Sequence, residues 1–111
     1  MDGIANVGLW PAERARRAPE REAIVEVDSG RRFTYAAFEA RIARAVRWLE
    51  RCGVGAGDRV VLALPNGAPY LELHFAVARL GAIDVPLNTR LAARNRAGIA
   101  ELTLDRPASA P

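Results

Sequence analysis

The alternation of apolar and polar residues predicts a short helix followed by a hairpin at the start of the chain. Residues 5–18 have a helical pattern in which Pro11 is tolerated in the first turn. Residues 22–28, EAIVEVD, mix apolar and polar positions as a strand does. A turn signal at residues 28–30 and the run RRFTY at 31–35 predict a second strand, and therefore a β-hairpin.

The clearest helical pattern runs from Thr34 to Cys52. Its apolar residues recur at spacings of four, four, three and three and form one stripe, which comprises Phe38, Ile42, Val46, Leu49 and Cys52. Arginine and glutamate occupy the other side, and Trp48 is expected to cover the edge of the stripe. Gly53 is placed to end the helix in the left-handed conformation.

A strand–helix–strand pattern follows. Residues 59–65, RVVLALP, form a nearly continuous apolar run, typical of a strand buried on both faces. Asn66 is a candidate cap for a helix over 68–80, which carries Leu71, Phe75 and Ala78 on one face. Residues 82–88, AIDVPLN, then predict a second strand. These lengths fit a parallel βαβ crossover.

The end of the chain carries weaker signals. Residues 91–104 predict a helix, although Asn95 and Gly98 weaken it. The final segment, 105–111, is rich in proline and alanine and is expected to be a disordered tail. We therefore expect one α/β domain over residues 5–104, containing the hairpin and the βαβ unit.

Composition narrows the class of protein. The hydrophobic fraction of 50% and the charged fraction of 26% are ordinary for a globular protein. The net charge is +3, but the arginines are interleaved with glutamate rather than gathered in a block, so no nucleic-acid partner is expected. No apolar run approaches the roughly 20 residues that span a bilayer. Asp2 and a short apolar run do not fit a secretion signal, so a cytoplasmic location is expected.

The residue types that carry chemistry are scarce. All 16 basic residues are arginine, so chemistry that needs a lysine cannot be completed by this chain alone. Cys52 is the only cysteine and His74 the only histidine. We expect Cys52 to be a buried structural thiol, and His74 to be a packed or surface residue rather than a catalytic one.

The glycine-rich run GVGAGD at residues 53–58 resembles a dinucleotide-binding fingerprint only superficially. That fingerprint follows a strand and opens a helix, whereas these glycines follow a helix and lead into a strand. We predict a helix-to-strand turn, in which Asp58 accepts backbone N–H bonds.

The remaining acidic residues do not form a site by spacing. Asp84 either pairs with an arginine or lies on a sheet edge, and Glu20, Glu22 and Glu26 are expected to be solvated surface charges. The sequence thus predicts no catalytic, no cofactor-binding and no metal-ligating residue in this chain.

Taken in order, the segments from about Leu9 to Leu91 resemble the amino-terminal part of the AMP-dependent, adenylate-forming ligases. The resemblance includes FTYAAFEARI, the helix that ends in GVGAGD, the strand RVVLALPN and the segment ARLGAIDVPLN. PLNTR favours the acyl- and aryl-CoA synthetases within this family. The chain departs from the family pattern after Leu91, where paired glutamates of a following helix are missing.

The resemblance implies an ATP-driven adenylation of a carboxylate followed by thioester formation, with ATP, Mg²⁺ and coenzyme A as cofactors of the complete enzyme. The family's phosphate loop and its catalytic lysines match no position here. The resemblance therefore implies an incomplete amino-terminal fragment that is inactive alone. The alternatives are a noncatalytic module that complements the remainder of a ligase, or a nonfunctional gene remnant.

Overall fold

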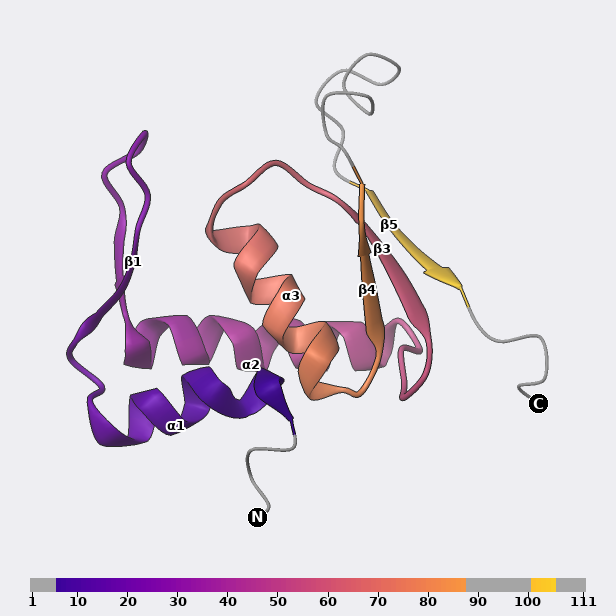
Figure 1. Ribbon diagram of the computed structural model, residues 1–111, viewed down its shortest axis with the longest axis horizontal. Coiled ribbons are helices and arrows are strands. Elements are labelled where there is room, and N and C mark those ends of the chain that lie inside the picture. The colour runs from indigo at the N-terminus through magenta and orange to yellow at the C-terminus, as the bar shows by residue number, and fades with distance from the viewer. Residues whose placement is uncertain (1–5, 88–100, 106–111) are drawn as a thin grey trace.

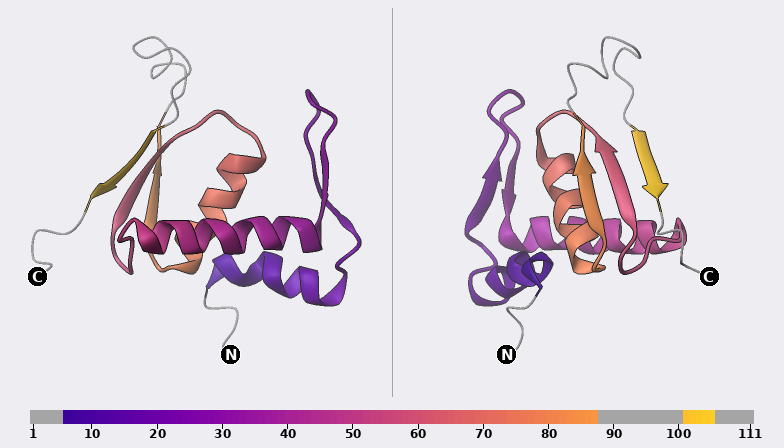
Figure 2. Two further views of the ribbon diagram at one scale, coloured as in Figure 1. Left: turned by 180° about the vertical axis from the view of Figure 1, so that it is seen from behind. Right: turned by 45° about the vertical axis from the view of Figure 1, so that its right-hand side comes forward.

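The computed structural model describes residues 6–87 and 101–105, which form helices and two small sheets (Figure 1). The long helix α2 underlies the molecule, and α1 lies along it. The β1–β2 hairpin rises from one end of α2 and a three-stranded sheet stands at the other, with α3 between them (Figures 1 and 2). In chain order the elements are η2 (Val7–Leu9), α1 (Trp10–Arg17), β1 (Glu22–Val25), β2 (Arg32–Thr34), α2 (Tyr35–Arg51), β3 (Arg59–Ala63), α3 (Ala68–Arg79), β4 (Ile83–Pro86) and β5 (Glu101–Asp105).

The predicted helix from Thr34 is confirmed, together with both of its ends. The side chain of Thr34 accepts a hydrogen bond from the Ala37 N–H at 3.1 Å, which caps α2. Gly53 follows the last turn with φ +92°, a conformation that glycine adopts without steric cost. These two local signals fix the length of α2, and with it the separation of the hairpin from the three-stranded sheet.

The core lies between α2, α3 and β3. Its largest fully buried side chains come from all three elements and are Ile42, Leu49, Val60, Leu62 and Val77. Phe38 of α2 meets Phe75 of α3 edge to face, with ring centroids 5.9 Å apart. The apolar stripe predicted on α2 is thus buried at Phe38, Ile42 and Leu49.

The end of that stripe was predicted incorrectly. Cys52 is exposed, because it is the C-cap residue of α2 and lies at the free end of the helix. Trp48 keeps 42% of its surface exposed, which is compatible with its expected place at the edge of the stripe. Helical spacing identifies which residues share a face, but it does not show how far along the helix the neighbouring elements reach.

The βαβ unit is confirmed. Strands β3 and β4 pair in parallel, from Arg59 opposite Ile83 to Leu62 opposite Pro86, and α3 makes the crossover. Strand β4 is an edge of the described sheet. Because Ile83 and Leu87 direct their N–H groups to β3, Pro86 lies where its missing N–H faces away from the ladder.

The predicted helix over 91–104 is wrong at its end. Residues 101–105 form β5, which pairs antiparallel with the second edge of β3, while residues 91–100 lie outside the described residues. Pairing with β3 satisfies backbone groups that a single edge would leave open, and this outweighs a weak helical pattern. Asp105, assigned to the tail, belongs to this strand, and residues 106–111 are outside the described part of the chain.

The buried face of α3 differs from the apolar face noted in its sequence. The helix buries Ala68, Glu72, Ala76 and Val77, whereas Leu71 is 37% exposed. A buried glutamate is tolerated here because Arg41 of α2 forms an ion pair with it. The face that α3 turns inward is therefore set by α2 and by this charge pair rather than by the largest apolar residues.

Arg79, the last residue of α3, connects this helix to both η2 and α2. Its guanidinium donates two hydrogen bonds to Glu39 of α2, at 2.7 and 2.8 Å, and two more to the carbonyl of Gly8. The Asn6 amide donates to the Arg79 carbonyl at 3.1 Å. Gly8 packs directly on this backbone, since a Cβ there would lie 2.4 Å from the Arg79 nitrogen.

We predict that Gly8→Ala destabilises the protein by about 1–3 kcal/mol, because a methyl group must push η2 away from the backbone of α3. Gly55→Ala is the matched control, since its nearest neighbour would lie 3.9 Å from the new Cβ. Urea unfolding followed by circular dichroism measures both variants. Equal stability of the two would contradict the close approach at Gly8.

Candidate functional site

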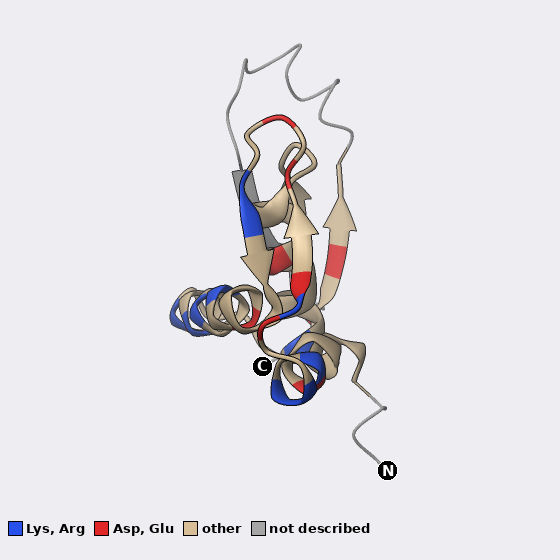
Figure 3. Cartoon of the chain, turned by 90° about the vertical axis from the view of Figure 1, so that its left-hand side faces the viewer, with Lys and Arg blue, Asp and Glu red and all other residues tan. Residues whose placement is uncertain are grey.

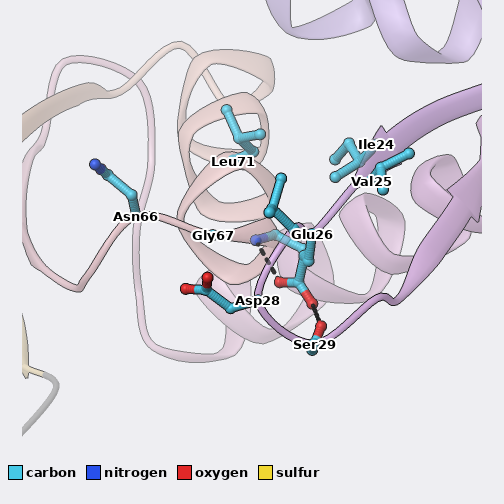
Figure 4. A pocket seen from close by; sticks show the side chains of 10 residues that line it. Ile24, Val25, Glu26, Asp28, Ser29, Asn66, Gly67 and Leu71 are labelled. Carbon is cyan, nitrogen blue, oxygen red and sulfur yellow. Dashed lines mark hydrogen bonds between the residues drawn. The ribbon is translucent and has the colours of Figure 1, made fainter.

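A groove lies between the hairpin and the start of α3 (Figure 4). Its volume is about 430 Å³. The walls come from the end of β1, the hairpin loop and the first turn of α3, and the lining residues are Ile24, Val25, Glu26, Val27, Asp28, Ser29, Asn66, Gly67, Ala68 and Leu71. The groove therefore joins two segments that are far apart in sequence.

Glu26 lies at the centre of this groove. Its carboxylate accepts a hydrogen bond from the Ala68 N–H and another from the Ser29 hydroxyl, both at 3.0 Å, and Arg31 lies 3.8 Å away (Figure 4). The Ala68 N–H, followed by the Ser29 hydroxyl, lowers the pKa of Glu26 below its ordinary value. The carboxylate is therefore ionised and held in place at neutral pH.

This arrangement decides what the strand-to-helix junction can bind. The N-terminus of a helix attracts anions through its free N–H groups and its dipole, which is how many proteins hold phosphate. At α3 the protein's own Glu26 carboxylate takes that position. The junction of the βαβ unit consequently has a negative charge where a nucleotide phosphate would need a positive one.

From the sequence, Glu26 is predicted to be a solvated surface charge, and that prediction is wrong. Asn66 was the predicted cap of α3, whereas the N-cap residue is Gly67, which has no side chain to donate or accept. The partner Ala68 is 42 residues from Glu26. No local pattern signals such a cap, because it requires the hairpin to fold over α3.

His74 and Asp84 form a second polar cluster. Asp84 lies on the edge strand β4, as one of its two predicted alternatives stated, but its partner is His74 rather than an arginine, with Nδ1 and Oδ2 2.7 Å apart. Tyr70 stacks on the imidazole at a centroid distance of 6.5 Å. The pair joins α3 to β4. Its geometry supports a structural role, in which the pair holds α3 against β4.

The glycine-rich run 53–58 is a helix-to-strand turn, as predicted. Asp58 accepts a hydrogen bond from the Gly55 N–H at 2.7 Å, which closes the turn before β3. Gly57 donates its N–H to the Gly81 carbonyl at 2.9 Å, which ties this turn to the one before β4. The run therefore stabilises the lower end of the parallel pair.

A second, shallower groove of about 630 Å³ runs along α2 beside Phe33. Arg41, Arg44 and Arg47 line it, and Arg41 lies over the Phe33 ring at 5.1 Å. Figure 3 shows the basic residues of α1 and α2 on the helical layer below the strands. Arg41 forms an ion pair with Glu72, so its charge is already neutralised within the protein.

Two kinds of site are not found within residues 6–87 and 101–105. No group of three histidine, cysteine, aspartate or glutamate side chains is arranged to hold a metal ion. None of the helices in this part of the chain combines the length and the apolar character that crossing a membrane requires. That the chain contributes no catalytic or cofactor-binding residue stays a prediction.

Comparison with known proteins identifies the class to which this fold belongs. The family described as "AMP-binding enzyme" matches residues 11–104. The match covers the hairpin, α2 and the whole βαβ unit. The chain belongs to the AMP-binding enzyme family.

The curated relatives are much longer than this chain. A long-chain-fatty-acid–CoA ligase, FadD13 of Mycobacterium tuberculosis, is 41% identical over 90 residues, which are 81% of this chain and 18% of the relative. A feruloyl-CoA synthase of an Amycolatopsis species is 44% identical over 85 residues, or 77% of this chain and 17% of the relative. The chain thus spans less than one fifth of these proteins.

Solved structures show the same fold. A fatty acyl CoA synthetase of Mycobacterium tuberculosis matches with a TM-score of 0.77 at 39% identity, over 85% of this chain and 19% of that one. The inhibitor-bound N-terminal domain of FACL13 from the same organism matches with a TM-score of 0.75 at 40% identity, over 80% of this chain and 22% of that domain. The described fold is therefore part of a larger N-terminal domain in these neighbours.

We predict that Glu26→Gln lowers the melting temperature at neutral pH, because the neutral amide loses the charge that favours the N-terminus of α3. The pKa of Glu26 is lowered in the folded protein from an ordinary value of 4.5, so the carboxylate stabilises the fold above that pH. This contribution disappears as the pH falls through the lowered pKa. Thermal melts from pH 7 to pH 3 should show the two proteins converging in acid, and a constant difference would contradict the charged cap.

Proposed function

We propose that the chain is the amino-terminal portion of an AMP-forming acid–CoA ligase domain. In the complete enzyme a carboxylate oxygen would attack the α-phosphate of ATP and release pyrophosphate. The thiol of coenzyme A would then attack the acyl carbon of the adenylate and release AMP. Family membership and the names of the two relatives support this reaction class.

Within such an enzyme, the chain supplies framework rather than reacting groups. The observation that carries this proposal is Glu26, which fills the N-terminus of α3 at the strand-to-helix junction of the βαβ unit. The sequence also lacks any lysine that could neutralise a phosphate or assist its transfer. ATP, Mg²⁺ and coenzyme A therefore do not fit the described residues and are assigned to the remainder of the enzyme.

The identity of the acid is also assigned to the remainder. By their names, the two relatives act on a long-chain fatty acid and on ferulate, which differ in size, shape and polarity. Both are similarly related to this chain, at 41% and 44% identity. Because this segment is shared by enzymes for such different acids, we infer that it supports the acid-binding pocket and does not select the acid. The cytoplasmic location and the domain limits 5–104 stay predictions.

A second candidate function is that of a separate complementation module that binds the rest of a ligase. The edge strand β4 favours it, since an unpaired edge can take another strand. Exposed Ile83 on that strand and Leu87 just after it, at 51% and 47%, add apolar surface beside the edge. Both candidate functions require the same partner, the remaining four fifths of the enzyme.

We expect the purified chain to show no acid-dependent exchange of pyrophosphate into ATP above the protein-free background. Addition of a separately produced FadD13 polypeptide that lacks the matching segment should restore exchange with a long-chain fatty acid. Exchange by the chain alone would overturn the framework role. Failure of the mixture to associate would overturn complementation, and the polypeptide without the chain is the control.

A further inference from the structure

The β1–β2 hairpin contacts the core at its base, through Phe33, Ala23 and Ile24, while its loop extends beyond α2. It is a sheet of two short strands, and it rises from the helical layer in all views (Figures 1 and 2). An isolated two-stranded hairpin is at best marginally stable in water. Its base is tied by the Tyr35 N–H to the Arg21 carbonyl at 2.9 Å, and its loop is tied to α3 by Glu26.

These two attachments give the groove fixed walls. Glu26 bridges the hairpin loop to the first residue of α3, so the loop cannot move away from the helix without breaking the cap. On either side of the cap lie exposed aliphatic side chains. Val27 of the loop is 88% exposed, Val25 of β1 42% and Leu71 of α3 37%. All three line the same groove.

Such a surface is unfavourable in water and suited to a partner. The three side chains form an apolar patch with a preformed shape, rimmed by the polar residues Asp28, Ser29 and Asn66. The Glu26 carboxylate has two hydrogen-bonding partners, and Arg31 lies 3.8 Å from it, which lowers the cost of covering it. The occupant is therefore expected to be aliphatic at its centre and polar at its edges.

The relatives indicate where that occupant comes from. The region that matches this chain makes up 22% of the N-terminal domain of FACL13, so most of that domain lies outside the matched region. We propose that the groove between the hairpin and α3 is the surface on which an apolar segment of the remaining ligase domain docks. This inference rests on the proposed function, and it adds the surface and the chemistry of the contact.

The inference can be tested by binding. The lone Cys52 is exposed and lies at the opposite end of α2 from the hairpin, so it can carry a fluorophore without entering the groove (Figure 1). Fluorescence anisotropy of the labelled chain is measured against the FadD13 polypeptide that lacks the matching segment. The test variants are Val27→Asp, in a loop that favours aspartate, and Leu71→Gln, at an exposed helical position.

We expect each test variant to bind at least about tenfold more weakly, because each replaces an aliphatic side chain that docking would bury with a polar or charged one. Trp10→Gln is the matched control, since Trp10 is a 55% exposed apolar residue on another helix and outside the groove. It should bind within about twofold of the unmodified chain. Circular dichroism melts should show that all three variants remain folded.

The outcomes separate the two proposals. Tight binding by the unmodified chain with unchanged binding by both groove variants overturns the groove and leaves complementation intact. No binding by the unmodified chain overturns complementation and, with it, the groove. If all three variants bind equally weakly, the groove is also overturned. The loss of affinity would then result from removing any exposed apolar side chain, whether or not it lies in the groove. If a groove variant unfolds, Val25→Thr replaces it, since threonine favours a strand and keeps the shape of valine.

Discussion

The apolar face of α2 is the constraint on which the described fold depends. The helices α1 and α3 and both hairpin strands pack against this one helix, and Ile42 and Leu49 on it are fully buried. Its length places the hairpin and the three-stranded sheet at opposite ends of the molecule. The groove, the crossover and the turn before β3 all take their positions from that separation.

Arginine takes structural roles in this protein that are easily mistaken for signs of an anion site. Arg41 neutralises the buried Glu72, and Arg79 binds Glu39 and the Gly8 carbonyl. Both guanidiniums cross between helices, where a planar group with several donors can satisfy more than one acceptor. Some of the arginines that contribute to the net charge of +3 therefore connect helices within the protein. The net charge is for this reason a poor indicator of the chemical class of the binding partner.

Local patterns predicted the elements well. Each of these predictions depends on residues close together in sequence: the cap at Thr34, the stripe on α2, the hairpin turn and the apolar runs that flank α3. The misses share a cause. The Glu26 cap, the exposure of Leu71 and the strand β5 each depend on a partner far away in sequence, which periodicity does not encode. The candidate groove could not be predicted for the same reason, since its two walls meet only after folding.

The contact between Gly8 and Arg79 has a consequence for the order of events on the ribosome. The two residues are 71 positions apart, so η2 leaves the exit tunnel long before the helix that receives it. The contact of η2 with α3 can therefore form only after α3 has been synthesised. During that interval the apolar residues Val7, Leu9 and Trp10 emerge without their neighbours. The segment η2 and the helix α3 therefore cannot reach their native positions independently of each other.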